Sequence, residues 1–293
     1  MAFGRGPARS DRARLGHVPR PITYVDVFTD SPYRGNPVAV VHDATGLSTG
    51  DMQRFARWTN LSETTFLLPP TEPGADYLLR IFTPAAELPF AGHPTLGSCH
   101  AWLASGGVPA SADEVVQQCG AGLVKIHRGA DRLAFAAPPL VRSGPIDAGL
   151  LADVVAALGV KPSAVVDSAW VDNGPGWLAV LLGSAEEVLA VRPSFIDQDI
   201  GVVGPHAAGS AEAFELRAFF PVNGALREDP VTGSLNASVA QWLLGSGRAS
   251  APYVASQGTA LGWAGRAHIS RDGDGTIWVG GGTVTCVAGE VQL

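Results

Sequence analysis

The feature that most constrains this chain is a pattern that occurs twice. [His or Asp]-Pro-x-x-Gly-Ser occupies residues 93–98 and 229–234. Each copy follows a strand-like segment that starts at an arginine, Arg80 or Arg217, and each is followed by an apolar run. Because these features keep the same order in both places, we infer that the chain contains a duplicated unit.

The repeated stretch has the chemistry of a helix start. Proline fits the first helical turn, and an aspartate before it is a good N-cap. The Gly-Ser pair leaves backbone N–H groups open at an end that carries partial positive charge and can hold a carboxylate. The sequence therefore predicts that Gly97-Ser98 and Gly233-Ser234 lie at equivalent helix starts. The runs that follow are apolar on nearly every face, which predicts buried helices.

Short β-branched and alternating segments outnumber the helical ones along the rest of the chain. This pattern indicates an α+β fold of two similar lobes with a cleft between them. We expect a disordered basic tail at residues 1–20, an N-terminal lobe at 21–138 and a C-terminal lobe at 139–282. The final strand, 283–293, is a candidate addition to the N-terminal lobe.

The composition and the motifs argue against several classes of protein. The chain has 293 residues, of which 46% are hydrophobic and 16% charged, and its net charge of −7 argues against a nucleic-acid-binding face. No apolar run is long enough to span a membrane. The three cysteines, Cys99, Cys119 and Cys286, lack metal-type spacing and form an odd set, so we expect reduced thiols in a cytoplasmic protein. Nucleotide and metal motifs are also missing, and neither cofactor nor metal is expected.

A few polar residues near the repeat could carry chemistry. Glu63 is an acid inside a predicted strand, and the second half has no glutamate at the matching place. If buried, its pKa would rise toward neutrality and it could move protons; the alternative is an exposed strand face. His93 could act as acid or base, or bond its local backbone. Asp229 and Ser234 are equally compatible with simple capping.

Four motifs together resemble those of the phenazine biosynthesis PhzF family. They are Asp26-Val-Phe-Thr with Gly35-Asn36-Pro37, and the segments at residues 60–66, 87–95 and 228–234. That family is similar in fold to diaminopimelate epimerase. The resemblance implies two pseudo-symmetric lobes, each a β-barrel-like sheet wrapped around a central helix, with the active site between the helix starts.

The resemblance also implies an activity. The named member of the family is a cofactor-free isomerase of trans-2,3-dihydro-3-hydroxyanthranilate, in which a glutamate moves the proton. Matched motif by motif, the catalytic residues here would be Glu63, His93 and Asp229. The residues that hold the substrate and its carboxylate would be Gly92, Gly233, Ser234 and Asn36.

Two departures from related patterns bear on the substrate. Epimerases of this fold use two cysteines at the helix starts, whereas Cys99 lies beyond the motif here. Trp263 and Ala264 replace an Arg-Pro pair that the family often shows. We therefore expect an isomerase acting on a small carboxylate-bearing metabolite, for which a cyclic, dihydro-hydroxyanthranilate-like acid is one candidate. The alternatives are a lyase or cyclase using the same Glu63, or a small-molecule-binding protein without turnover. A homodimer is the expected assembly, with no nucleic-acid or membrane partner.

Overall fold

The computed structural model describes residues 18–129 and 131–293. Residues 1–17 of the predicted basic tail lie outside this part. The tail was predicted to reach residue 20, which is wrong, because strand β1 begins at Pro19. Arg20 is 8% exposed and donates hydrogen bonds to the carbonyls of Asp43 and Thr45. These contacts bring the end of the basic segment into the fold.

The first lobe contains eight strands and two helices. Its elements are β1 (Pro19–Val27), β2 (Asn36–Val41), α1 (Thr49–Thr59), β3 (Glu63–Leu68), β4 (Tyr77–Phe82), β5 (Glu87–Leu88), α2 (Gly92–Ala104), β6 (Glu114–Cys119), β7 (Gly122–Arg128) and β8 (Leu133–Ala136). Strand β2 pairs parallel to β3, and β4 pairs parallel to β6, whereas the other pairs are antiparallel.

The second lobe repeats this order of elements and pairings. Its elements are β10 (Val165–Asp172), β11 (Leu178–Leu182), α4 (Ala185–Ala190), β12 (Ile200–Pro205), β13 (Phe214–Val222), β14 (Ala225–Asp229), α5 (Gly233–Gly245), β15 (Tyr253–Gln257), β16 (Gly265–Arg271) and β17 (Ile277–Gly281). Here β11 pairs parallel to β12 and β13 pairs parallel to β15. The predicted α+β fold with two pseudo-symmetric lobes is confirmed.

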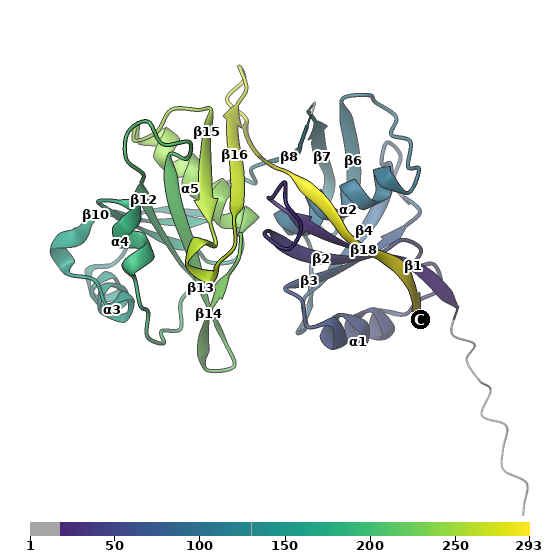
Figure 1. The fold of residues 1–293 in the computed structure, drawn as a ribbon, viewed down its shortest axis with the longest axis horizontal. Helices are drawn as coiled ribbons and strands as arrows, with labels where there is room; N and C mark the ends of the chain where they lie inside the picture. Colours follow the sequence, from purple (N-terminus) through teal and green to yellow (C-terminus); the bar gives the residue numbers. More distant parts are fainter. Residues whose placement is uncertain (1–17, 130) are drawn as a thin grey trace, which may run out of the picture.

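The remaining elements lie between the two lobes in sequence, within the second lobe, or after it. They are β9 (Arg142–Gly144), α3 (Ala148–Leu158), the short 3-10 helices η1 (Pro162–Ala164) and η2 (Thr259–Leu261), and β18 (Thr283–Gln292). Strand β9 pairs with β10, and β8 pairs with β17. Strand β18 leaves the second lobe and pairs with β1 of the first (Figure 1). The two sheets are therefore joined twice.

The register predicted for the duplication is wrong by five residues. Helices α2 and α5 both have 13 residues, and they begin at Gly92 and Gly233. The residue equivalent to Gly233 is therefore Gly92, whereas Gly97 lies more than one turn inside α2. The prolines misled the prediction, because Pro94 sits in the first turn of α2 while Pro230 precedes α5.

The hairpins before the two helices show the correct register. Arg80 pairs with Glu87, and Arg217 pairs with Glu228, at shortest distances of 2.6 and 2.7 Å. Phe82 faces Glu87 across β4 and β5, as Phe219 faces Glu228 across β13 and β14. Each glutamate is followed five residues later by the glycine that starts the helix, so the shared pattern is Glu-x-Pro-x-x-Gly.

Helices α2 and α5 lie inside their lobes, as their all-round apolar character predicts. One continuous core contains residues of both helices, including Leu96, Cys99 and Leu235. Close packing requires glycine where the sheet meets α2, because a Cβ on Gly97 would lie 2.4 Å from Val38. The outer helices α1 and α4 cover the far faces of the sheets and bury separate clusters. The starts of α2 and α5 are thus fixed by the packing of the lobes.

Candidate active site

Glu63 and His93 form the centre of the candidate site. Glu63 is the first residue of β3, not a mid-strand residue as predicted, and His93 is the second residue of α2. Glu63 Oε2 lies 3.3 Å from His93 Nδ1, and the side chains are only 15% and 5% exposed. Glu63 is therefore not on an exposed strand face. Strand β12, which takes the place of β3 in the second lobe, begins at Ile200 and has no glutamate.

Burial controls the charge of both groups. Loss of hydration raises the pKa of Glu63 to about 8, and the nearby Asp229 carboxylate adds to this rise. Burial also lowers the pKa of His93 to about 3, against the opposing effect of the Pro37 carbonyl. At neutral pH Glu63 is thus mostly protonated and His93 is neutral. Glu63 Oε2 and His93 Nε2 have no hydrogen-bond partner among the described residues.

Asp229 reaches the same place from the second lobe. It is the last residue of β14, and Thr232 occupies the N-cap of α5, so Asp229 does not cap this helix, which was the alternative to a chemical role. Asp229 Oδ1 accepts a hydrogen bond from Asn36 Nδ2 at 3.2 Å, and Oδ2 accepts one from Thr232 Oγ1 at 2.6 Å. Burial raises the pKa of Asp229 to about 6, and the hydroxyl of Thr232 and the amide of Asn36 oppose the rise.

Asn36 links the two lobes at the site. This residue starts β2 in the first lobe and is fully buried. Its Nδ2 group donates to the Val231 carbonyl at 2.9 Å as well as to Asp229. Nearby, the N–H of Ala264 donates to the carbonyl of Arg34 at 2.8 Å. The loop before β2 therefore holds the second lobe against the first.

The starts of α2 and α5 meet at two glycines. A Cβ on Gly233 would lie 3.2 Å from Gly92 Cα and 3.2 Å from the His93 nitrogen. A Cβ on Gly92 would lie 2.4 Å from the ring of Phe135. First-turn N–H groups have no acceptor within their own helix, and both helix starts carry partial positive charge. The two ends together can hold one anionic group.

Ser234 has partners that the sequence did not reveal. The indole Nε1 of Trp177 donates to Ser234 Oγ at 3.0 Å, and Asn173 Nδ2 donates to the Ser234 carbonyl at 2.9 Å. Because the hydroxyl oxygen already accepts from Trp177, its hydrogen is available to an acceptor such as a carboxylate. The structure therefore brings together all seven predicted site residues and adds Trp177, Asn173, Thr232 and Gln257 around them.

The thiols lie away from this chemistry. Cys99 is fully buried inside α2, and burial raises its pKa to about 12. A thiol with such a pKa is inert as a base at neutral pH. In the described part of the chain, no cluster of three or more His, Cys, Asp and Glu side chains is placed to hold a metal ion. No helix between residues 18 and 293, residue 130 apart, is long and apolar enough to cross a membrane.

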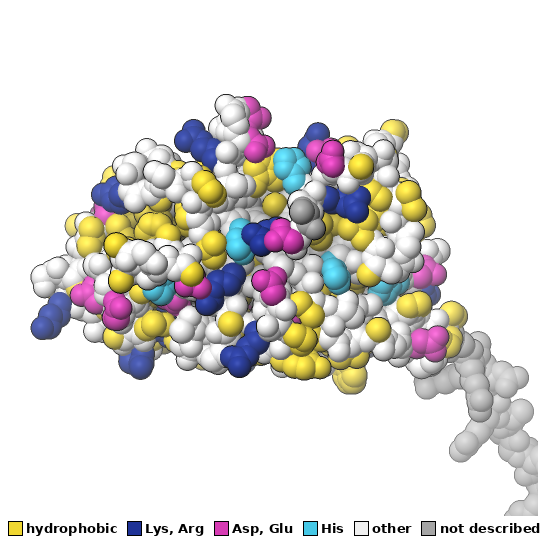
Figure 2. Space-filling model, turned by 45° about the horizontal axis from the view of Figure 1, so that its top comes forward, with side chains coloured by type: hydrophobic (Ala, Val, Ile, Leu, Met, Phe, Trp, Pro, Cys, Tyr) yellow, Lys and Arg dark blue, Asp and Glu magenta, His cyan; other side chains and the backbone are white. Residues whose placement is uncertain are grey.

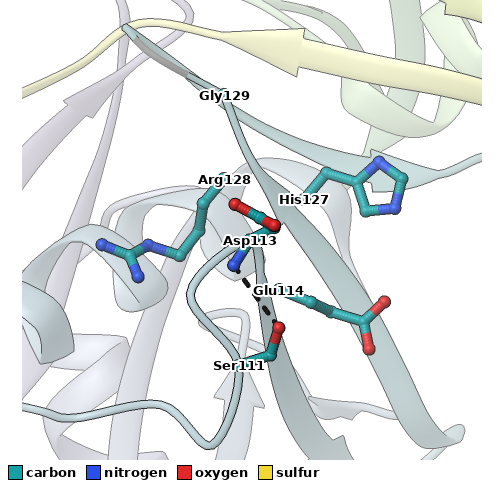
Figure 3. A pocket seen from close by; sticks show the side chains of 6 residues that line it. All are labelled: Ser111, Asp113, Glu114, His127, Arg128 and Gly129. Atoms are coloured by element: carbon teal, nitrogen blue, oxygen red, sulfur yellow. Dashed lines mark hydrogen bonds between the residues drawn. The ribbon is translucent and has the colours of Figure 1, made fainter.

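The molecular surface carries open hollows that contain none of the predicted site residues. An open hollow of about 470 Å³ lies beside β6 and β7 and contains none of the predicted site residues; its lining residues are Ser111, Asp113, Glu114, His127, Arg128 and Gly129. Figure 3 shows Arg128 pointing away from Glu114 and His127, so the charged groups do not converge. On the face shown in Figure 2, basic side chains alternate with acidic ones.

Known proteins resemble this chain over most of its length. The PhzC-PhzF family model, described as phenazine biosynthesis-like protein, matches residues 25–289. Antisense-enhancing sequence 1 of Schizosaccharomyces pombe is 36% identical over 286 residues, which cover 91% of this chain and 96% of the relative. The trans-2,3-dihydro-3-hydroxyanthranilate isomerase of Pseudomonas chlororaphis is 36% identical over 218 residues, 72% of this chain and 74% of the relative.

A crystal structure supports the same relationship. The phenazine biosynthesis protein PhzF family member from Enterococcus faecalis superposes with a TM-score of 0.77 and 25% identity. The superposition covers 94% of this chain and all of that protein. The predicted family resemblance and the predicted fold class are both confirmed.

Proposed function

Because the chain belongs to the PhzC-PhzF family of phenazine biosynthesis-like proteins and is an isomerase, we propose that it moves a proton on a small carboxylate-bearing metabolite without a cofactor. Glu63 is the proton shuttle in this proposal. The observation that carries it is the buried contact of Glu63 with His93, in which Glu63 Oε2 and His93 Nε2 have no hydrogen-bond partner among the described side chains and backbone groups.

The electrostatics suit a carboxyl group that must both accept and release a proton. A general acid–base works best when its pKa is near the operating pH, and burial brings Glu63 to about 8. The protonated form would give its proton to one carbon of the substrate, and the carboxylate left behind would take a proton from another carbon, which restores the protonated form. The reaction then has no net change in atoms or charge. His93 stays neutral and can bond the substrate through Nε2 without carrying charge.

The substrate carboxylate would bind where the two helices meet. The donors to the carboxylate would be the N–H groups at Gly92 and Gly233 and the hydroxyl of Ser234. Asn36 and Asp229 would line the other side of the binding site. This arrangement would place the remainder of the substrate beside Glu63. By similarity to the Pseudomonas isomerase, the substrate is a cyclic acid of the dihydro-hydroxyanthranilate type. Trp263 and Ala264, which depart from the family pattern, are where its specificity would differ.

Deuterium incorporation tests the proposal. The protein is incubated in D2O with trans-2,3-dihydro-3-hydroxyanthranilate, and with a panel of amino and hydroxy acids, and carbon-bound deuterium is followed by NMR. Glu63→Gln should reduce exchange by roughly 10²–10⁴-fold, as for a lost general acid–base. Glu290→Gln, a change at an exposed position on β18, is the matched control and should keep full activity. Full activity in Glu63→Gln would overturn the shuttle role.

The same experiment separates the alternatives. A lyase or cyclase would release or close a product whose formation also needs Glu63, and NMR would show a new skeleton rather than an isomer. A binding protein would shift the ligand resonances without exchange. The homodimer and the cytoplasmic location stay predictions.

A further inference from the structure

Gln257 uses its whole amide group to hold the segment that carries Asp229. It is the last residue of β15 and is 1% exposed. Its Oε1 accepts from the Thr232 N–H at 3.0 Å and from Asn236 Nδ2 at 2.8 Å. Its Nε2 donates to Thr232 Oγ1 at 3.0 Å and to the Asp229 carbonyl at 3.2 Å. Strand β15, which carries Gln257, pairs with β13 on one side and with β16 on the other, so the backbone at Gln257 is held on both sides.

These contacts fix the direction of the hydrogen bond from the Thr232 hydroxyl to Asp229. The Thr232 N–H can only donate, so the atom of Gln257 facing it must be the oxygen and the other must be the NH2 group. The NH2 group can only donate, so it donates to Thr232 Oγ1. The single hydroxyl hydrogen of Thr232 is then free to point at Asp229 Oδ2, which lies 2.6 Å away.

The other oxygen of Asp229 is constrained in the same way. Asn36 Nδ2 contacts the carbonyl of Val231, which can only accept, so this atom is a donor. It therefore also donates to Asp229 Oδ1. Both oxygens of Asp229 are thus acceptors of directed hydrogen bonds, and a proton on either oxygen would make that oxygen a weaker acceptor.

We propose that Gln257, acting through Thr232, keeps Asp229 a hydrogen-bond acceptor and so leaves the proton of the Glu63–Asp229 pair on Glu63. Gln257 and Thr232 are positioning residues in this arrangement, because neither needs to touch the substrate. The inference deepens the proposed function and rests on it for its catalytic meaning, since a shuttle must have a defined starting state. The protonation order itself is a property of the ligand-free protein.

The surrounding groups do not provide this order by themselves. Besides Glu63 on β3, Asp229 has His93 on α2 across the junction, and that ring is neutral near pH 7. Its neighbour on β14, Glu228, is ion-paired with Arg217 on β13 at 2.7 Å, and its charge still raises the pKa of Asp229. The higher pKa of Glu63 relative to Asp229 agrees with the order inferred from the hydrogen bonds.

The test is a carboxyl titration of the full chain without substrate. Side-chain carboxyl carbons of Glu and Asp are labelled with 13C and followed by NMR from pH 4 to 9, and Glu63→Gln and Asp229→Asn assign the two resonances. Thr232→Val keeps the shape of the side chain and removes the hydroxyl. We expect the Asp229 midpoint to rise and the Glu63 midpoint to fall, each by roughly one pH unit, which is the effect of losing one hydrogen bond to a charged group.

Thr232→Ser is the matched control, because it restores the hydroxyl and should restore both wild-type midpoints. If Thr232→Val does not fold, Gln257→Met serves instead, since it removes the donor that orients the Thr232 hydroxyl. Unchanged midpoints in a folded Thr232→Val or Gln257→Met would overturn the inference. Absence of deuterium exchange in the wild-type protein, together with the expected midpoint shifts in Thr232→Val, would instead contradict only the proposed function.

Discussion

Replacing Glu63 by glutamine should change how stability depends on pH. The pKa of Glu63 is about 8 in the folded protein and 4.5 in the unfolded chain. Because the folded pKa is the higher one, the stabilising contribution of Glu63 is complete below pH 4.5. It decreases as pH rises and is lost at about pH 8. The difference of 8 − 4.5 = 3.5 pKa units corresponds to about 5 kcal/mol, at about 1.36 kcal/mol per unit.

The interval from pH 7 to pH 9 isolates this effect. The pKa of Asp229 is raised to about 6, so its effect on the pH dependence of stability is complete by pH 7. His93 works in the opposite direction, since its lowered pKa costs stability only as pH falls from 6.5 toward 3. The wild type should therefore lose about 1 kcal/mol between pH 7 and 8 through Glu63, followed by a levelling above pH 8. Glu63→Gln should lack this loss.

Urea unfolding measures the effect directly. The seven tryptophans report unfolding by fluorescence, and the free energy of unfolding is measured at half-unit steps from pH 7 to 9. A constant offset between the variant and the wild type does not affect the test, because the diagnostic quantity is the difference between the two slopes. Glu290→Gln, at an exposed position, should retain the wild-type slope. Equal slopes for wild type and Glu63→Gln would refute a buried, protonated Glu63.

Three further changes probe the rest of the site. Cys99→Ala should keep the isomerase activity measured by deuterium exchange, because its thiol stays protonated, while urea unfolding shows a loss of about 1–2 kcal/mol for the cavity. Gly233→Ala should weaken binding of a carboxylate such as anthranilate by at least tenfold in calorimetry, because the added Cβ would press on Gly92 and His93. Trp177→Phe removes the donor to Ser234 and should raise KM more than it lowers kcat; an unchanged KM would contradict a role for Trp177 in orienting the hydroxyl.

The sequence predicted the duplication but not its register. The helices at α2 and α5 could be foreseen because their apolar character persists on every face. The pattern that aligned them relied on proline, and proline is equally acceptable in the first turn, as Pro94 is, and just before a helix, as Pro230 is. The ion pairs of Arg80 and Arg217 with their hairpin glutamates reveal the correct alignment only once the pairing of the strands is known.

The residues of the candidate site could also be predicted only in part from the sequence. Glu63, His93 and Asp229 could be named because acids and histidines stand out in apolar surroundings. Thr232 and Gln257 could not, because a threonine and a glutamine are ordinary residues until their partners are known. Gln257 lies 25 residues after Thr232, and Asn36 lies 193 residues before Asp229. Local spacing carries no information about contacts that the sheet creates between distant segments.

The crossing of β18 has a consequence for synthesis of the protein. Strand β1 is translated before the other strands of the fold, but its partner on one side, β18, is translated more than 250 residues later. Until then the outer edge of β1 has open backbone groups, which invite pairing with other nascent chains. Val18 and Leu293 lie side by side, with the N–H of Val18 3.0 Å from the Leu293 carbonyl. A circular permutant that links residue 293 to residue 18 and opens the chain at residues 137–141 would translate both partners in succession, and should aggregate less during expression.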